Sequence, residues 1–272
     1  MPEPTMHFDI ENINNAIDEV ETTPCHDIND FLRVRRILNE WKGHLKNLPK
    51  RLNAPTASIK KTAVEHIQGY FSKVEGALES INRRLQLFVE DQLEPVITEN
   101  DGNCLYLSFA KQLNLSPDEC RQKIIQHMKE NKSKYQTAVE SLMKYDEALQ
   151  MKYKKFIEKI GETIVDNPHS TPEKKLREHG QFALEEYLKI KLKKEPEPFD
   201  YYCFWMTQDL SWGGAPEISA MSDLLERPVL IFRDSPKQGY LFNHIYNENH
   251  AGNPLILHQK QDHHFQPLHL KS

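Results

Sequence analysis

A tight polar turn that brings a cysteine to the start of a helix has the clearest chemical meaning in this sequence. Residues 101–104 read Asp-Gly-Asn-Cys, and apolar residues then recur at helical spacing as far as Leu113. Cys104 is therefore predicted in the first turn of a helix, where the positive end of the helix dipole favours thiolate over thiol. The backbone N–H groups of such a turn can also hold a developing oxyanion. The pattern favours a nucleophilic cysteine over a buried structural one.

A cysteine nucleophile needs a base close to its sulfur atom, and that base can be distant in the sequence. Residues 262–268 read Asp-His-His-Phe-Gln-Pro-Leu and run into a strand predicted over 265–270. The two histidines are therefore candidate bases. A metal site is disfavoured, because neither partner cysteines nor a His-x-x-x-His spacing accompanies them.

Two adjacent glycines mark a third segment. Residues 212–217 read Trp-Gly-Gly-Ala-Pro-Glu and open a predicted helix. Glycine is scarce, with 10 residues in a chain of 272, where ordinary usage of roughly 7% would give about twice as many. A glycine pair at this place is thus less easily attributed to chance.

Helices are predicted to precede these segments and strands to follow the last of them. Apolar residues three or four apart over 28–48 and 59–88 predict two long antiparallel helices, with a turn at 49–55. Ser116, Pro117 and Glu119 predict a capped helix that runs to about residue 131. Strand patterns appear only beyond Arg227. The expected fold is α+β, with one small mixed sheet flanked by helices.

We expect a helical hairpin region over residues 1–94 and a second domain over 95–272. The second domain is predicted to contain a long helical insertion at about 133–198, rich in lysine and glutamate.

Composition excludes several classes of protein. A net charge of −5 argues against a general nucleic-acid binder. No apolar run is long enough to span a membrane, and the first residues lack the basic and apolar regions of a signal peptide. The four cysteines are scattered without a C-x-x-C pair, so we expect no disulfide framework, no structural zinc, and a reducing, cytoplasmic compartment.

The three segments together resemble the ovarian-tumour (OTU) family of cysteine peptidases, most of which are deubiquitinases. The match consists of the nucleophile loop that ends at Cys104, the middle motif that begins at Trp212, and a closing His-aromatic motif. It implies a papain-like fold and a thiol-dependent hydrolase with no cofactor. The implied partners are ubiquitin and polyubiquitin chains.

The same resemblance assigns residues to roles. It implies that Cys104 is the nucleophile, that the base is His264 and not His263, and that Asp101 is a catalytic-site residue of the nucleophile loop. The residues implied to contact substrate, beside a channel for a diglycine tail, are Trp212, Gly213, Gly214 and Phe265.

The group that would orient the histidine departs from the family pattern. Many members have Asn or Asp two residues after the His, and this chain has Gln266 there. Gln266, Asp101, and an acid well upstream such as Glu65 or Glu75 are the alternatives. Asp101 is equally well explained as a residue that shapes the turn.

The helical stretch between residues 115 and 211 is longer than usual for the family. It resembles the helical lobe inserted in OTU deubiquitinases that intracellular bacteria use as effectors, which would place the protein inside a host cell. Two alternatives to hydrolysis of ubiquitin conjugates stay open. One is an OTU-fold module that binds ubiquitin and cleaves it weakly or not at all, and the other is a peptidase for a different protein tail.

Overall fold

A computed structural model of the chain describes residues 27–51, 57–99, 102–162, 196–208, 211–235, 239–261 and 264–271, with isolated positions at 13–15, 17, 18, 22 and 190. Asp101 and His263 lie outside the described residues. The chain divides into two compact units. One comprises residues 1–94, 235–243 and 270–272, and the other comprises residues 95–234 and 244–269.

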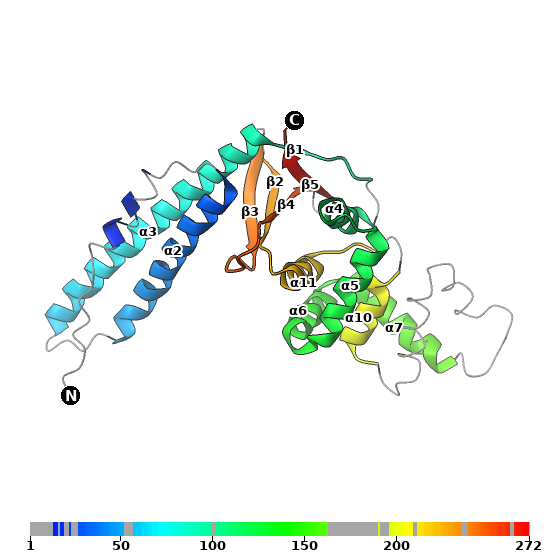
Figure 1. The fold of residues 1–272 in the computed structure, drawn as a ribbon. Helices are drawn as coiled ribbons and strands as arrows, with labels where there is room; N and C mark the ends of the chain where they lie inside the picture. Colours follow the sequence, from blue (N-terminus) through cyan, green and yellow to red (C-terminus); the bar gives the residue numbers. More distant parts are fainter. Residues whose placement is uncertain are drawn as a thin grey trace. The chain divides into compact units, whose positions relative to one another are not determined.

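Two long helices dominate the first unit (Figure 1). Helix α2 (Ile28–Asn47) is preceded by its N-cap residue Asp27, whose side chain accepts the N–H of Asp30. The 3-10 turn η1 (Leu48–Arg51) follows the helix. Helix α3 (Ala57–Gln92) runs back along α2: Phe31 stacks near Phe88, and Lys42 pairs with Glu75. The predicted antiparallel hairpin is confirmed. The expectation that strands appear only beyond Arg227 is wrong, because residues 93–95 form strand β1 (Leu93–Pro95).

Six helices in the described part of the second unit pack around its core. They are α4 (Cys104–Leu113), α5 (Pro117–Glu130), α6 (Lys132–Tyr145), α7 (Glu147–Glu162), α10 (Pro198–Met206) and α11 (Ala215–Leu225). The predicted capping box of α5 is present: the Ser116 N–H donates to the Glu119 carboxylate, and the Glu119 N–H donates to the Ser116 hydroxyl. The predicted insertion at about 133–198 is described only in part. Helices α6 and α7 fall within it, and residues 163–189 and 191–195 lie outside the described residues.

A mixed five-stranded sheet completes the predicted α+β architecture. Its other strands are β2 (Val229–Asp234), β3 (Tyr240–Tyr246), β4 (Leu255–Lys260) and β5 (His264–Leu270), in the order β1-β5-β4-β2-β3. Strand β4 runs parallel to β2 and antiparallel to β5. The first four residues of β2 and of β4 are all buried, as expected for central strands covered on both faces. No helix in the described segments has both the length and the apolar character needed to cross a membrane.

Candidate active site

Cys104 is the first residue of α4 and is 1% exposed. The helix is apolar along its buried side, so packing against the core fixes its start in space. Asn103 is the N-cap residue, and its carbonyl oxygen accepts the N–H of Leu107 at 2.8 Å. The thiol therefore lies at the positive end of the helix dipole.

The start of β5 lies directly against this helix start. The backbone N–H of Phe265 donates to Cys104 Sγ at 3.5 Å. The peptide that follows His264 therefore touches the sulfur atom. His264 itself is 7% exposed. The fold thus brings together the predicted nucleophile and the backbone of the predicted base, which are 160 residues apart in the sequence.

Two hydroxyl groups hold the Phe265 peptide in this place. Its carbonyl oxygen accepts from Thr98 Oγ1 at 2.6 Å and lies 3.0 Å from Ser108 Oγ. Ser108 Oγ is also 2.7 Å from the carbonyl oxygen of Cys104. Ser108 is one helical turn after Cys104, so its hydroxyl connects the nucleophile helix to the strand that carries the base. Neither residue was predicted from the sequence, because only the packing of α4 against β5 gives it this role.

Removing the Ser108 hydroxyl is expected to loosen this contact. We expect Ser108→Ala to lower the free energy of unfolding by about 1 kcal/mol, the usual size of a neutral hydrogen bond, and to lower the peptidase rate several-fold. Thermal melts and turnover of the same preparation measure both effects.

Ser116→Ala is the matched control for Ser108→Ala. At the start of α5 the Ser116 hydroxyl accepts the N–H of Glu119 as a helix cap, and its loss also costs about 1 kcal/mol. Among the described hydrogen bonds, none joins Ser116 to β5. The turnover of the Ser116→Ala variant should therefore stay at the wild-type level. Equal losses of turnover in the two variants would show that Ser108 acts through stability alone.

Gln266 lies two residues beyond His264 on β5, so the two side chains share one face of the sheet. Opposite Gln266 on β4 is His258, whose ring Nε2 lies 2.8 Å from Asp234 Oδ1 at the end of β2. His258 is buried, as is Gln266. The sequence carried no sign of this pair, because it depends on the register between β4 and its two neighbours.

The upstream acids belong to a different compact unit from Cys104 and His264. Glu65 and Glu75 are on α3, which belongs to the other compact unit, and Glu75 pairs with Lys42 at 2.9 Å. The predicted role of Asp101 falls on a residue outside the described part of the chain.

The glycine segment packs onto the nucleophile helix. A Cβ atom at Gly213 would lie 2.7 Å from Leu105 Cδ2 and 3.2 Å from the Tyr106 hydroxyl, so a larger residue there would have to displace the end of the Leu105 side chain. Gly214 is the N-cap of α11, and its N–H donates to Glu217 Oε2 at 2.8 Å. Trp212 is 46% exposed. Of the four residues expected to contact substrate, Gly213 therefore lies against the first turn of α4.

The fourth of these residues is Phe265. Its side chain is buried in the core that includes Cys104 and Phe109, and its backbone N–H donates to the thiol. The predicted contact of Phe265 with substrate stays a prediction.

The other described cysteines differ from Cys104 in their surroundings. Burial, with a smaller contribution from the Glu119 carboxylate, raises the pKa of Cys120 to about 11, so it stays a thiol at neutral pH. Cys203 is buried within α10. Among the described cysteines, only Cys104 lies at a helix start.

Glu217 is a fully buried carboxyl group behind the glycine segment. It accepts hydrogen bonds from the Gly214 N–H and from the Tyr202 hydroxyl, both at 2.8 Å. Burial raises its pKa, and these hydrogen bonds together with the charge of Arg121 offset the rise only in part.

The raised pKa of Glu217 predicts a pH-dependent stability. In the unfolded chain the Glu217 carboxyl group has a pKa of about 4.3, and in the folded chain its pKa is higher. Between these two pKa values the folded state binds more protons than the unfolded state. The free energy of unfolding therefore falls as pH rises through this window. Glu217→Gln removes this loss of stability, because a glutamine side chain does not ionise. It can keep both hydrogen bonds if its amide N–H donates to the Tyr202 hydroxyl oxygen. The Tm of the variant should therefore rise relative to the Tm of the wild type as pH increases from 4 to 8. A Tm difference that is constant over this range would contradict the prediction.

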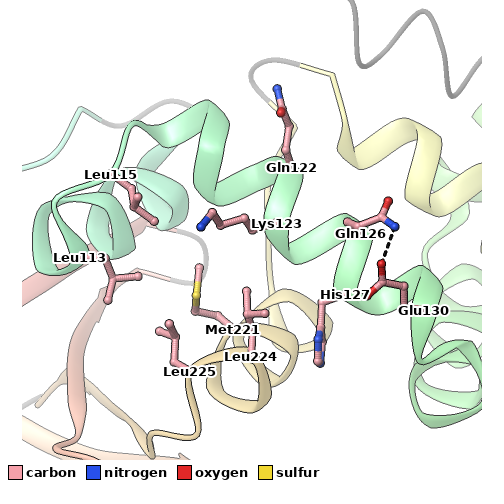
Figure 2. Close-up of a pocket in the computed structure, with 10 residues that line it drawn as sticks. All are labelled: Leu113, Leu115, Gln122, Lys123, Gln126, His127, Glu130, Met221, Leu224 and Leu225. Atoms are coloured by element: carbon pink, nitrogen blue, oxygen red, sulfur yellow. Dashed lines mark hydrogen bonds between the residues drawn. The ribbon is translucent and has the colours of Figure 1, made fainter.

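A separate pocket of about 520 Å³ lies at the far end of α4 (Figure 2). It is enclosed by Leu113 and Leu115, by one side of α5, and by Met221, Leu224 and Leu225 of α11. At 1.5 Å per residue, the ten-residue helix places Leu113 roughly 13 Å from Cys104 along its axis. The pocket is therefore distinct from the cysteine site.

Comparison with known proteins gives a family match over this region. The model of the family described as OTU-like cysteine protease matches residues 99–265, more than half of the chain. The matched stretch contains the segments at 101–104 and 212–217 and ends inside the histidine segment, one residue after His264. No curated protein sequence matches the chain at the level applied.

Several solved structures are similar. The OTU domain protease of Farallon virus is 15% identical, with 67% of this chain and 87% of that chain covered and a TM-score of 0.41. The OTUD1 OTU domain is 12% identical, with coverages of 71% and 93% and a TM-score of 0.36. The Hazara virus OTU bound to ubiquitin is 19% identical, with coverages of 68% and 85% and a TM-score of 0.33.

Proposed function

Because this chain belongs to the family of OTU-like cysteine proteases, we propose that it is a deubiquitinase that hydrolyses isopeptide bonds after the C-terminal glycine of ubiquitin. The observation that carries the proposal is the contact between Cys104 Sγ and the backbone N–H that follows His264. It unites a helix-start cysteine with a histidine strand inside the matched segment. Ubiquitin is proposed as substrate because it is the substrate of most members of the family that the sequence resembles.

In the proposed reaction, His264 takes the proton of the Cys104 thiol, and the thiolate attacks the carbonyl carbon of the terminal glycine. Backbone N–H groups of the turn that ends at Cys104 and of the first turn of α4 hold the oxyanion, and one such donor is worth about 10²–10³ in rate. His264 then gives the proton to the leaving lysine amine, and the C–N bond breaks to leave a thioester. Water, deprotonated by His264, hydrolyses the thioester and restores the thiol.

We propose that Gln266 orients His264 within this mechanism. The two residues share a face of β5, and a glutamine oxygen can accept the imidazole N–H. Gln266 on β5 lies opposite His258 on β4, and the His258 ring hydrogen-bonds to the Asp234 carboxylate. A carboxylate is therefore linked through His258 to the side of the sheet where the neutral Gln266 amide lies. Asp101 keeps its proposed place in the nucleophile loop.

The diglycine tail is proposed to run past Trp212 toward Cys104. Gly213 lies in close contact with the α4 side chains next to Cys104, and the neighbouring indole is exposed. A channel lined by glycine backbone accepts a tail of two glycines and excludes bulkier residues.

Hydrolysis of a fluorogenic amide at the ubiquitin C-terminus, followed by a panel of diubiquitins, tests the proposal. We expect fluorophore release and cleavage of at least one linkage. Tight binding of ubiquitin without cleavage would instead identify a binding module. If ubiquitin is neither bound nor cleaved while Cys104 remains reactive, the substrate is another protein tail.

A further inference from the structure

Arg121 is a buried cation next to the nucleophile turn. It lies in the second turn of α5 and is 3% exposed, which is rare for arginine. None of its hydrogen bonds to described residues reaches a carboxylate. Burying a charged group in this way is expensive unless its hydrogen bonds are made, so its contacts indicate what it does.

One arm of the guanidinium holds the residue before the nucleophile. Arg121 Nη2 donates to Asn103 Oδ1 at 2.5 Å. Asn103 is the N-cap of α4, yet its side chain makes no capping hydrogen bond with that helix. An asparagine at this position ordinarily accepts from the N–H groups of the first turn. The contact with Arg121 therefore draws the Asn103 oxygen away from the donors that the oxyanion needs.

The other arm holds the segment that leads to Trp212. Arg121 Nη1 donates to the Met206 carbonyl at 2.7 Å and to Ser211 Oγ at 3.0 Å. The same guanidinium lies 3.8 Å from the centre of the Tyr106 ring, in the first turn of α4. A single side chain thus connects the cysteine turn, its helix and the residue before the Trp-Gly-Gly segment.

We infer that Arg121 is a positioning residue for acyl transfer: it fixes Asn103 so that the first-turn N–H groups of α4 stay available to the oxyanion, and it keeps the Trp212 segment in register with Cys104. The inference rests on the proposed function. Lysine cannot replace Arg121 in this role, because an ammonium group is a point charge without the planar fork that reaches both sides.

Arg121→Lys tests the inference by a split between kcat and KM. With Asn103 released to cap the helix, kcat for the fluorogenic ubiquitin amide should fall about 10²-fold, the size of one lost oxyanion donor, and KM should change less than threefold. Ser116→Ala on the same helix is the control for lost stability and should keep its kcat. A kcat within threefold of wild type, at an equal folded fraction, would overturn the inference.

A double-mutant cycle tests whether Arg121 acts through Asn103. If it does, Asn103→Ala and Arg121→Lys together should cost no more than the larger single effect. Independent, multiplying losses would refute this route.

Alkylation of the Cys104 thiol needs no ubiquitin, so it can test the inference about Arg121 even if the proposed function is wrong. If the wild type does not hydrolyse the amide, the proposed function fails, and alkylation of Cys104 by iodoacetamide then tests Arg121. Arg121→Met removes the positive charge beside the turn and should slow alkylation several-fold, whereas Ser116→Ala should stay within twofold. Equal rates in the wild type and Arg121→Met would refute a role at the thiol.

Discussion

Replacing Cys104 by alanine is expected to abolish hydrolysis and leave the fold intact. The side chain is small and buried, so losing one sulfur atom costs about 1 kcal/mol of stability. The nucleophile has no substitute, so turnover should fall by about 10⁴-fold or more. Turnover of the fluorogenic amide and a thermal melt of the same sample measure the two effects.

Cys120→Ala is the matched control. Cys120 is also fully buried, but its raised pKa keeps it protonated, and it lies inside α5. The same chemical change there should leave turnover within twofold. Residual activity in Cys104→Ala, or loss of activity in a folded Cys120→Ala, would remove Cys104 from the nucleophile role.

Replacing His264 by glutamine is expected to have the second-largest effect. Glutamine preserves hydrogen bonding but cannot exchange a proton near neutral pH, and general acid–base catalysis contributes about 10²–10⁴ in rate. We expect kcat to fall by this factor. Alkylation of Cys104 should also slow, because the base no longer helps to form the thiolate. Steady-state kinetics and the alkylation rate measure the two changes.

Two neighbouring histidines serve as controls for His264. His269 lies on the same strand and is exposed, and His263 precedes the proposed base directly. Both glutamine variants should keep turnover within threefold. A large loss in His263→Gln with little loss in His264→Gln would reassign the base.

His258→Gln should give a loss of turnover between that of His264→Gln and that of the control variants, if the His258–Asp234 pair supports Gln266.

Local patterns predicted much of the fold. The helix that starts at Cys104, the capping box at Ser116 and the hairpin of α2 and α3 follow from apolar spacing and capping chemistry between near neighbours. These features depend on residues a few positions apart, so a single sequence contains them. Strand β1 was missed because three residues are too few for a strand pattern.

Contacts between distant segments were not predictable in the same way. Thr98 and Ser108 meet the Phe265 carbonyl only because α4 packs on β5, and His258 meets Asp234 only through the register of β2 and β4. Arg121 reads in sequence as one more charge on an amphipathic helix. Its burial against Asn103 and Ser211 exists only in the folded chain.

The most direct test of the proposed mechanism is covalent capture with ubiquitin that carries an electrophile at its C-terminus. Intact wild-type protein should gain the mass of one ubiquitin, and peptide mapping should place the bond on Cys104. The adduct should be absent in Cys104→Ala and present in Cys120→Ala. An adduct on another cysteine, or tight ubiquitin binding with no adduct in the wild type, would contradict the account.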